Sequence, residues 1–251
     1  MNTKFVTSLA LGALAGACEL EDGGAVVYNY NQNGADWGID SPLCDTGVEQ
    51  SPIDLTAATL SEKLMLSLAD YENYVTGDVK LKDHTLEFGV TDGVLSLAFG
   101  DDQLPADFNP LQFHFHAPSE HVIDGEYMDL EVHIVHLYST GGLGAVIGIM
   151  FDRVAGGNSD NPFIEALDFE NADPDGNPVE NVNLKDFLDG VDMTNFWSYN
   201  GSLTTPPCTE GIKWTVIKDV QPISDAQLAG FNRWFSSRPE YAMGNGNNRE
   251  V

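Results

Sequence analysis

The sequence predicts a mainly β domain with short helices at its periphery. Alternating or continuous apolar segments dominate the middle of the chain, and they have the lengths of strands. Helix signals are confined to short stretches, and no Pro-, Gly- or Ser-rich linker divides the chain after residue 27. The chain has 251 residues, a length that single β-rich domains reach. We therefore expect one domain over residues 26–251.

The first predicted strands lie at residues 86–90 and 94–100. They flank the sequence TDG, a turn signature, so the pair predicts a β-hairpin. A third strand is predicted over residues 111–116, where apolar and polar residues alternate strictly. Its apolar face holds Leu111, Phe113 and Phe115.

Three more strands are predicted further along the chain. Residues 129–137 alternate so that Glu131, His133 and Val135 share a face. Residues 144–151 form a continuous apolar run, which is typical of a strand buried on both faces. Residues 212–219 are predicted to form the last of these strands.

The predicted helices are short. Ser224 followed by Gln227 is a capping-box pattern that opens a helix over residues 224–235. Residues 159–167 offer a cap and an early proline, which is typical of a helix N-terminus.

The charge balance limits the partners of this chain. It has 39 Asp and Glu residues against 11 Lys and Arg residues, a formal net charge of −28. Such a surface repels phosphate and anionic membranes, so no nucleic-acid partner is expected. The acidity is interpreted as an adaptation for solubility. No segment is long enough for a transmembrane helix.

The N-terminus predicts a signal peptide over residues 1–17. A weakly basic start, MNTK, precedes an apolar run that ends in Ala15-Gly16-Ala17, an A-x-A cleavage pattern. The expected location is therefore secreted, periplasmic or extracellular. Lipidation of Cys18 is an alternative, although Ala15 stands where such signals usually carry Leu. A buried N-terminal helix is a second alternative.

The cysteine count fits a secreted chain. With Cys18 at the signal boundary, Cys44 and Cys208 remain as a pair. Two cysteines in a secreted protein suggest one disulfide that closes a long loop. Two free buried thiols are the alternative.

The sequence QFHFH predicts a metal site. His114 and His116 lie two residues apart on a strand, so they are about 6.5–7 Å apart along the backbone and their side chains point the same way. His133 lies on another strand with the same alternation and can supply a third nitrogen. Three neutral imidazoles with an open fourth position are the pattern of a catalytic zinc site.

Polar neighbours support this hypothesis. Gln112 and Glu131 each stand two residues before a candidate ligand, where they can accept its second N–H. The alternative for any single histidine is a satisfied core residue. His121 and His136 fall outside the alternation and are interpreted as structural. No G-x-S-x-G motif supports a serine nucleophile.

Longer motifs carry a family resemblance. The segments QFHFH, SEH, LEVHIVH and NGSLTTPPCTEGIKW resemble those of the α-class carbonic anhydrases, as do YNYNQNGADWG, EQSPIDL and GNNR. The similarity runs from about residue 28 to residue 249. It implies a large, mostly antiparallel, twisted central sheet. It also implies reversible, zinc-dependent hydration of carbon dioxide to bicarbonate and a proton, by attack of zinc-bound hydroxide and with a histidine proton shuttle.

The resemblance implies roles for individual residues. The zinc ligands are His114, His116 and His133. Their outer partners are Gln112, Glu131 and the backbone carbonyl of Asn247. The catalytic residues are Thr204, Glu120, the shuttle His84, and Tyr30 in an ordered-water network. The residues lining the substrate pocket are Val135, Val146, Leu203, Thr205, Ile212 and Trp214. The disulfide of secreted members matches Cys44 and Cys208.

The family resemblance also implies inhibition by sulfonamides and anions. One departure concerns Glu87, which stands where the family often carries an amide. If Glu87 lines the cleft, its charge raises the pKa of His84. Two other functions remain as alternatives: a silent family member used for binding, and a different three-histidine metalloenzyme such as a cupin-type oxygenase.

Overall fold

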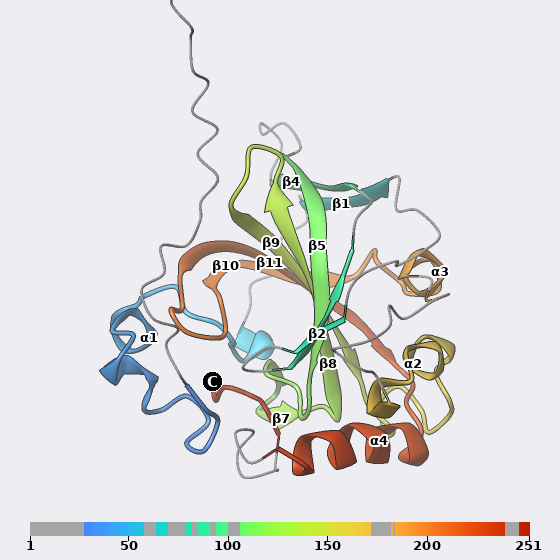
Figure 1. The fold of residues 1–251 in the computed structure, drawn as a ribbon. Coiled ribbons are helices and arrows are strands. Elements are labelled where there is room, and N and C mark those ends of the chain that lie inside the picture. The colour runs from blue at the N-terminus through green and yellow to red at the C-terminus, as the bar shows by residue number, and fades with distance from the viewer. Residues whose placement is uncertain are drawn as a thin grey trace, which may run out of the picture.

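A nine-stranded sheet forms the centre of the computed structural model (Figure 1). The model describes residues 28–57, 64–69, 79–81, 85–90, 94–99, 106–171, 182, 184–238 and 246–251. The predicted signal peptide and His84 lie outside these residues. The strands are β1 (Leu64–Ala69), β2 (Val79–Leu81), β3 (Leu86–Gly89), β4 (Val94–Phe99), β5 (Ala106–His116), β8 (Leu130–Tyr138), β9 (Leu143–Phe151), β10 (Phe196–Ser202) and β11 (Glu210–Gln221).

The order along the sheet is β1-β4-β5-β8-β9-β11-β10, and β3 joins β2 to β5. All of these pairs are antiparallel except β9 with β11. Strands β6 (Val122–Ile123) and β7 (Glu126–Tyr127) form a separate two-stranded sheet. The predicted fold class is therefore confirmed.

The predicted hairpin of residues 86–90 and 94–100 is wrong. Strand β3 pairs with residues 112–113 of β5, whereas β4 pairs with residues 106–108 of the same strand. Both segments form strands, as predicted. Each of them, however, pairs with a different part of the long strand β5. The local turn signature does not decide between these partners.

Strand β5 also departs from strict alternation. Phe113 and Phe115 are fully buried, but Leu111 is 41% exposed. The register with β8 shifts between Pro110 and Gln112, and a bulge of this kind turns a side chain away from its expected face. Strand β9 lies between β8 and β11, and all its residues after Leu143 are buried, as the continuous apolar run predicts.

Short helices lie around the periphery of the sheet (Figure 1). They are η1 (Trp37–Ile39), α1 (Leu43–Thr46), η2 (Leu55–Ala57), α2 (Pro162–Leu167), η3 (Phe169–Asn171), α3 (Leu184–Asp189) and α4 (Asp225–Ser236). The predicted capping box of α4 is present, and Asn161 caps α2 before its proline. Among the described residues, no helix is both long and apolar enough to cross a membrane.

Two apolar clusters lie within the molecule. In the larger one, Phe115 of β5 packs against Phe163 of α2 and Phe231 of α4. The smaller one, called here the tryptophan cluster, consists of Leu55, Val135, Val146, Met150, Ile212, Trp214 and Val216. The alternation of strands β5 and β8 therefore directs one set of side chains to the aromatic core and leaves the other face for the polar residues.

Cys44 of α1 forms a disulfide with Cys208, which confirms the predicted pair.

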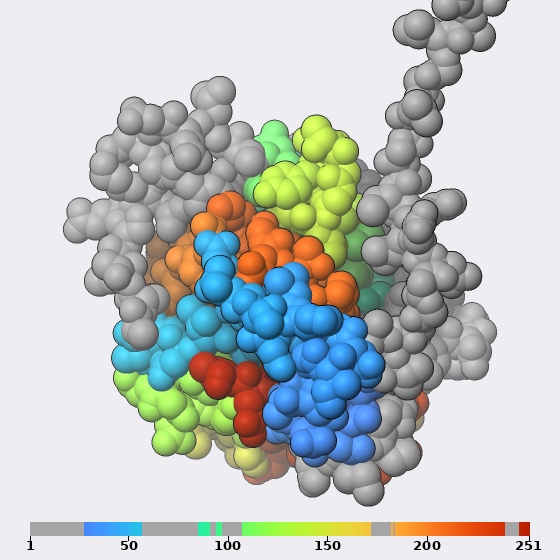
Figure 2. Space-filling model, turned by 90° about the vertical axis from the view of Figure 1, so that its left-hand side faces the viewer, coloured from blue at the N-terminus to red at the C-terminus, as the bar shows by residue number. Residues whose placement is uncertain are grey.

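The two ends of the described chain lie close together. Figure 2 shows the C-terminal residues in red beside the N-terminal segment in blue. The backbone N–H of Glu250 donates to the carbonyl of Asn33 at 2.9 Å.

Candidate metal centre

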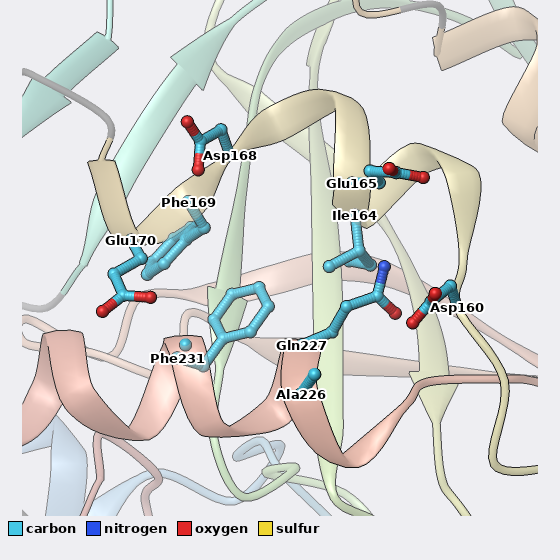
Figure 3. Close-up of a pocket in the computed structure, with 10 residues that line it drawn as sticks. Asp160, Ile164, Glu165, Asp168, Phe169, Glu170, Ala226, Gln227 and Phe231 are labelled. Atoms are coloured by element: carbon cyan, nitrogen blue, oxygen red, sulfur yellow. The ribbon is translucent and has the colours of Figure 1, made fainter.

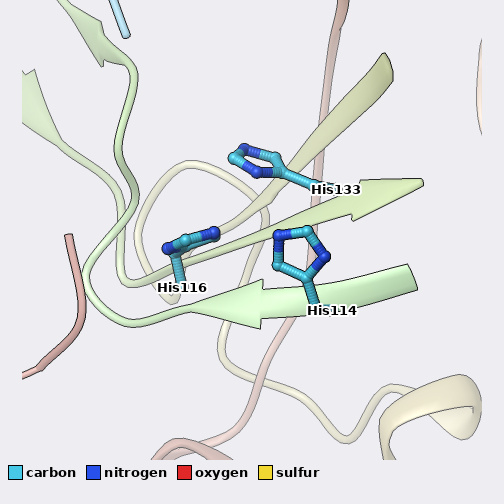
Figure 4. Close-up of side chains that lie close together, drawn as sticks. All are labelled: His114, His116 and His133. Atoms are coloured by element: carbon cyan, nitrogen blue, oxygen red, sulfur yellow. The ribbon is translucent and has the colours of Figure 1, made fainter. Parts of the chain in front are cut away.

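Three histidines from two adjacent strands meet on one face of the sheet. His114 and His116 lie on β5, and His133 on β8 is the cross-strand partner of His114. Figure 4 shows the three rings grouped around a common space. Each ring offers a nitrogen, and these three nitrogens lie within 4.8 Å of one another. The sequence prediction that these residues converge agrees with this geometry.

Burial shields the cluster from bulk water. The exposed fractions of His114, His116 and His133 are 7%, 0% and 1%. Burial lowers the pKa of His133, although Glu131 acts in the opposite direction. A neutral imidazole is the form that binds a metal, so this environment favours ligation.

Each ring uses its other nitrogen for an acceptor. Nδ1 of His114 lies 2.8 Å from Oε1 of Gln112, and Nδ1 of His116 lies 2.7 Å from the carbonyl oxygen of Asn247. Nε2 of His133 lies 2.9 Å from Oε1 of Glu131. These oxygens only accept hydrogen bonds, so the facing nitrogens carry the protons and the opposite nitrogens keep their lone pairs. The donor set therefore fits a zinc ion with three histidine ligands.

Glu131 is held as a buried carboxylate. Burial alone would raise its pKa, but the adjacent His121 and His133 hold the pKa of Glu131 well below its usual range. The backbone N–H groups of Glu120 and His121 donate to its second oxygen at 2.9 and 3.0 Å. This network fixes the carboxylate that orients His133.

His121 supports that carboxylate from the other side. Its Nδ1 lies 2.7 Å from Oε1 of Glu131, and its Nε2 lies 2.7 Å from the hydroxyl of Tyr199. Both ring nitrogens therefore have partners, which agrees with the structural interpretation of His121. Tyr199 was not identified from the sequence, because the hydrogen bond joins residues that are 78 positions apart.

Glu120 lies beside the cluster and is fully buried. Burial raises its pKa well above the usual range, and hydrogen bonding by Thr204 and by the backbone of Arg249 opposes that rise. The Arg249 N–H donates to Oε1 of Glu120 at 2.9 Å. A divalent cation among the histidines would lower the same pKa, because opposite charge favours the carboxylate.

The C-terminal residues bind this region to the N-terminal segment. The guanidinium of Arg249 donates to the carbonyls of Ser51 and Cys44, both at 2.7 Å. The side chain of Asn247 accepts from the backbone of Ala117 at 2.9 Å and donates to the carbonyl of Phe115 at 3.0 Å. The importance of Arg249 was not predicted, because no local pattern marks a contact with residues about 200 positions away.

The apolar residues of the predicted pocket gather next to the histidines. Val135, Val146, Ile212 and Trp214 belong to the tryptophan cluster, and Leu203 packs against it. The ring centroids of His133 and Trp214 are 4.8 Å apart. Apolar surface therefore adjoins the candidate metal centre.

The other predicted residues differ in how far the structure describes them. Thr204 is buried, Thr205 is partly buried, and both precede Cys208 in the same loop. Tyr30 is fully buried, and its ring lies 5.2 Å from that of Trp37. His84 lies outside the described residues.

A separate depression of about 260 Å³ lies between α2, η3 and α4 (Figure 3). The carboxylates that line it are Asp160, Glu165, Asp168 and Glu170. Glu170 is paired with Arg233 at 2.6 Å. None of the predicted site residues lines this depression, so it is not part of the candidate centre.

Comparison with known proteins gives a consistent result. Residues 32–251 match the family model of eukaryotic-type carbonic anhydrase. A carbonic anhydrase of Klebsiella pneumoniae is 32% identical over an alignment that covers 89% of this chain and 86% of that protein. Alpha carbonic anhydrase 3 of Arabidopsis thaliana is 33% identical, with 89% and 80% covered.

Solved structures share the fold. The α-carbonic anhydrase of Photobacterium profundum has a TM-score of 0.68 and 33% identity, and the match covers 89% of this chain and 95% of that chain. A halotolerant carbonic anhydrase from Dunaliella salina has a TM-score of 0.71 and 26% identity, with 89% and 93% covered. An α-carbonic anhydrase of Thermovibrio ammonificans, solved with sulfanilamide, has a TM-score of 0.63 and 28% identity, with 89% and 94% covered.

Proposed function

This chain belongs to the eukaryotic-type, or α-class, carbonic anhydrase family and hydrates carbon dioxide reversibly with zinc as cofactor, and we propose that His114, His116 and His133 are the zinc ligands. The observation that carries this assignment is that all three buried rings place one nitrogen against an acceptor and so keep a lone pair on the other. A zinc ion bound there lowers the pKa of a coordinated water to about 7 and supplies a nucleophile at neutral pH.

Thr204 and Glu120 orient the reaction in this proposal. The Glu120 carboxylate accepts a hydrogen bond from the hydroxyl of Thr204, which uses the only O–H of the threonine and leaves its oxygen as an acceptor. With zinc bound, that oxygen would accept a hydrogen bond from the zinc-activated nucleophile and so orient it toward the apolar wall. Arg249 keeps Glu120 in place through its backbone N–H.

The apolar wall binds the substrate. Carbon dioxide is neutral and weakly hydrated, so it is accommodated by side chains that offer no hydrogen bonds. The proposed wall consists of Val135, Val146, Leu203, Ile212 and Trp214, and Thr205 lines the cleft beside it. The proximity of Trp214 to His133 supports this assignment.

Proton transfer to bulk solvent is assigned to His84. An imidazole with a pKa near 7 accepts a proton from the site through water and releases it outside. Tyr30 contributes to the ordered-water network. These two roles rest on the family pattern of the sequence.

The disulfide between Cys44 and Cys208 indicates an extracytoplasmic protein, since such bonds persist in oxidising compartments. We propose that residues 1–17 are a cleaved signal peptide and that residues 26–251 form one carbonic anhydrase domain. Lipidation at Cys18 is the alternative processing outcome. Mass spectrometry of the mature N-terminus separates the two.

Sulfonamides and inorganic anions are proposed as inhibitors. A relative has been solved with sulfanilamide, and another, from Chlamydomonas reinhardtii, with acetazolamide. A negatively charged nitrogen or a small anion competes for the fourth position that three histidines leave open.

Stopped-flow hydration of carbon dioxide tests the assignment. Removal of zinc with a chelator is expected to reduce the rate to the uncatalysed level, and added zinc restores it. Thr204→Val is expected to lower kcat/KM about 100-fold, a typical cost of losing one orienting hydrogen bond.

The matched control is Thr215→Val. Thr215 is also buried, but its hydroxyl has no hydrogen-bond partner among the described residues. The Thr215→Val variant is therefore expected to hydrate carbon dioxide at the wild-type rate. Equal rates for the Thr204 variant and the wild type would contradict the proposed orientation. Full activity after complete zinc removal would contradict the metal assignment.

A further inference from the structure

Glu87 faces the zinc side of the sheet. In the antiparallel pair of β3 and β5, Phe88 is opposite Phe113 and Gly89 is opposite Gln112, so the next position places Glu87 opposite His114. Phe88 and Phe113 stack in the core with ring centroids 5.0 Å apart. Because side chains alternate along a strand, Glu87 projects from the other face, which carries His114.

Glu87 makes a contact that determines the orientation of an amide. Nε2 of Gln112 donates to Oε1 of Glu87 at 3.4 Å, while Oε1 of Gln112 lies 2.8 Å from Nδ1 of His114. An ionised carboxylate accepts hydrogen bonds and donates none. The amide must therefore turn its NH₂ group to Glu87 and its oxygen to His114.

The orientation of this amide selects the tautomer of His114. With the amide oxygen at Nδ1, that nitrogen carries the proton and Nε2 keeps its lone pair for a metal. A reversed amide would donate to Nδ1 and leave the proton on Nε2. That tautomer cannot bind a metal through Nε2 without first losing the proton.

We propose that Glu87 is a positioning residue of the zinc site, which acts through Gln112 to hold His114 in its metal-binding tautomer. The inference rests on the proposed zinc ligands. It gives a role to a residue that stands where the resemblance to the family leads one to expect an amide. The proposal assigns the effect of Glu87 to its contact with Gln112.

The first experiment uses zinc-free protein, so that it does not depend on catalysis. Long-range ¹H–¹⁵N NMR correlations of the His114 ring report which nitrogen carries the proton. The wild type is expected to show the proton on Nδ1. Glu87→Val is expected to show a substantial fraction with the proton on Nε2, because the freed amide can reverse. An unchanged tautomer in Glu87→Val would overturn the proposal.

The second experiment measures zinc affinity by chelator competition. Glu87→Val is expected to raise the Kd for zinc about tenfold, the low end of the range for residues that support metal ligands. Glu87→Gln keeps an acceptor oxygen at the same reach but can also donate, so it is expected to raise the Kd by about threefold, less than Glu87→Val. An unchanged Kd in Glu87→Val would overturn the proposal.

A double-mutant cycle tests whether Gln112 carries the effect. In a Gln112→Leu background, Glu87→Val is expected to change the zinc Kd less than twofold, because the amide that it acts on is gone. A full tenfold effect in that background would overturn the proposal. Asp107→Asn, which removes an exposed carboxylate from the same strand β5, is the matched control and is expected to bind zinc like the wild type.

Folding is checked by near-UV circular dichroism, and Glu87→Thr replaces Glu87→Val if the latter does not fold. Failure of the wild type to bind one zinc ion would contradict the proposed function itself. Because the tautomer is measured without zinc, that outcome is distinguishable from failure of the role assigned to Glu87.

Discussion

Buried histidines outside the zinc ligands differ in their surroundings. His121 has a carboxylate and a hydroxyl as partners, whereas His136 lies in strand β8 opposite Pro110 and Ala145. Burial lowers the pKa of His136 to about 3, although hydrogen bonds to the backbone of Ile134 and Ala145 oppose the shift. His136 is therefore neutral in the folded protein at neutral pH.

This makes His136 a source of acid instability. Between pH 6.5 and about 3 the unfolded chain binds a proton at this residue and the folded protein does not, so stability falls as pH falls. From pH 7 to pH 5 the expected loss is about 2 kcal/mol. Urea unfolding of the zinc-loaded wild type and of His136→Leu is expected to show this difference in pH dependence. Parallel curves would contradict the prediction.

At the scale of elements, the C-terminal segment 246–249 connects the metal centre to the loop after β5. Its first residue, Gly246, has a φ of +131°, and a Cβ there would lie 2.1 Å from the carbonyl oxygen of Ala117. The next residue, Asn247, orients His116. The close approach of the two backbones therefore positions the residue that contacts His116, a proposed zinc ligand.

Gly246→Ala is expected to lower the free energy of unfolding by about 2–3 kcal/mol, through backbone strain and displacement of the segment. Because Asn247 moves with it, the Kd for zinc is expected to rise about tenfold. The control is Gly142→Ala, where φ is +88° but no atom lies within 4 Å of the added Cβ. It is expected to cost about 1 kcal/mol and to leave zinc binding unchanged. Equal zinc affinities in the two variants would contradict this account.

At the scale of the whole molecule, the net charge of −28 opposes the compact state. Four carboxylates line the depression shown in Figure 3. Arg153 offsets part of the repulsion through its ion pairs with Asp129 and Asp225, both at 2.8 Å. With 39 acidic and 11 basic residues, most carboxylates have no basic partner of their own.

Salt is therefore expected to stabilise the protein. Raising NaCl from 0.1 M to 1 M shortens the screening length from about 10 Å to about 3 Å. The free energy of unfolding is expected to rise by about 1–2 kcal/mol as the repulsion is screened. KCl at equal ionic strength is expected to give the same gain. A flat or falling stability in both series would contradict the prediction.

Local sequence patterns determined much of this protein. A period of two residues placed His114 and His116 on one face, and it placed Glu131 and His133 on the matching face of the next strand. The continuous apolar run of β9 and the capping box of α4 were also confirmed, because each depends on neighbours in the chain. The roles of the residues around the metal remain predictions.

Only the tertiary structure decided the contacts between distant segments. It paired β3 with β5 instead of β4, which brought Glu87 opposite His114. It also brought Arg249 to Glu120 across 129 positions. A local pattern states which face a side chain occupies, but strand partners are chosen by packing and hydrogen bonding over the whole sheet. The sequence alone therefore placed the proposed metal ligands on matching strand faces, and the folded chain determined which distant residues contact them.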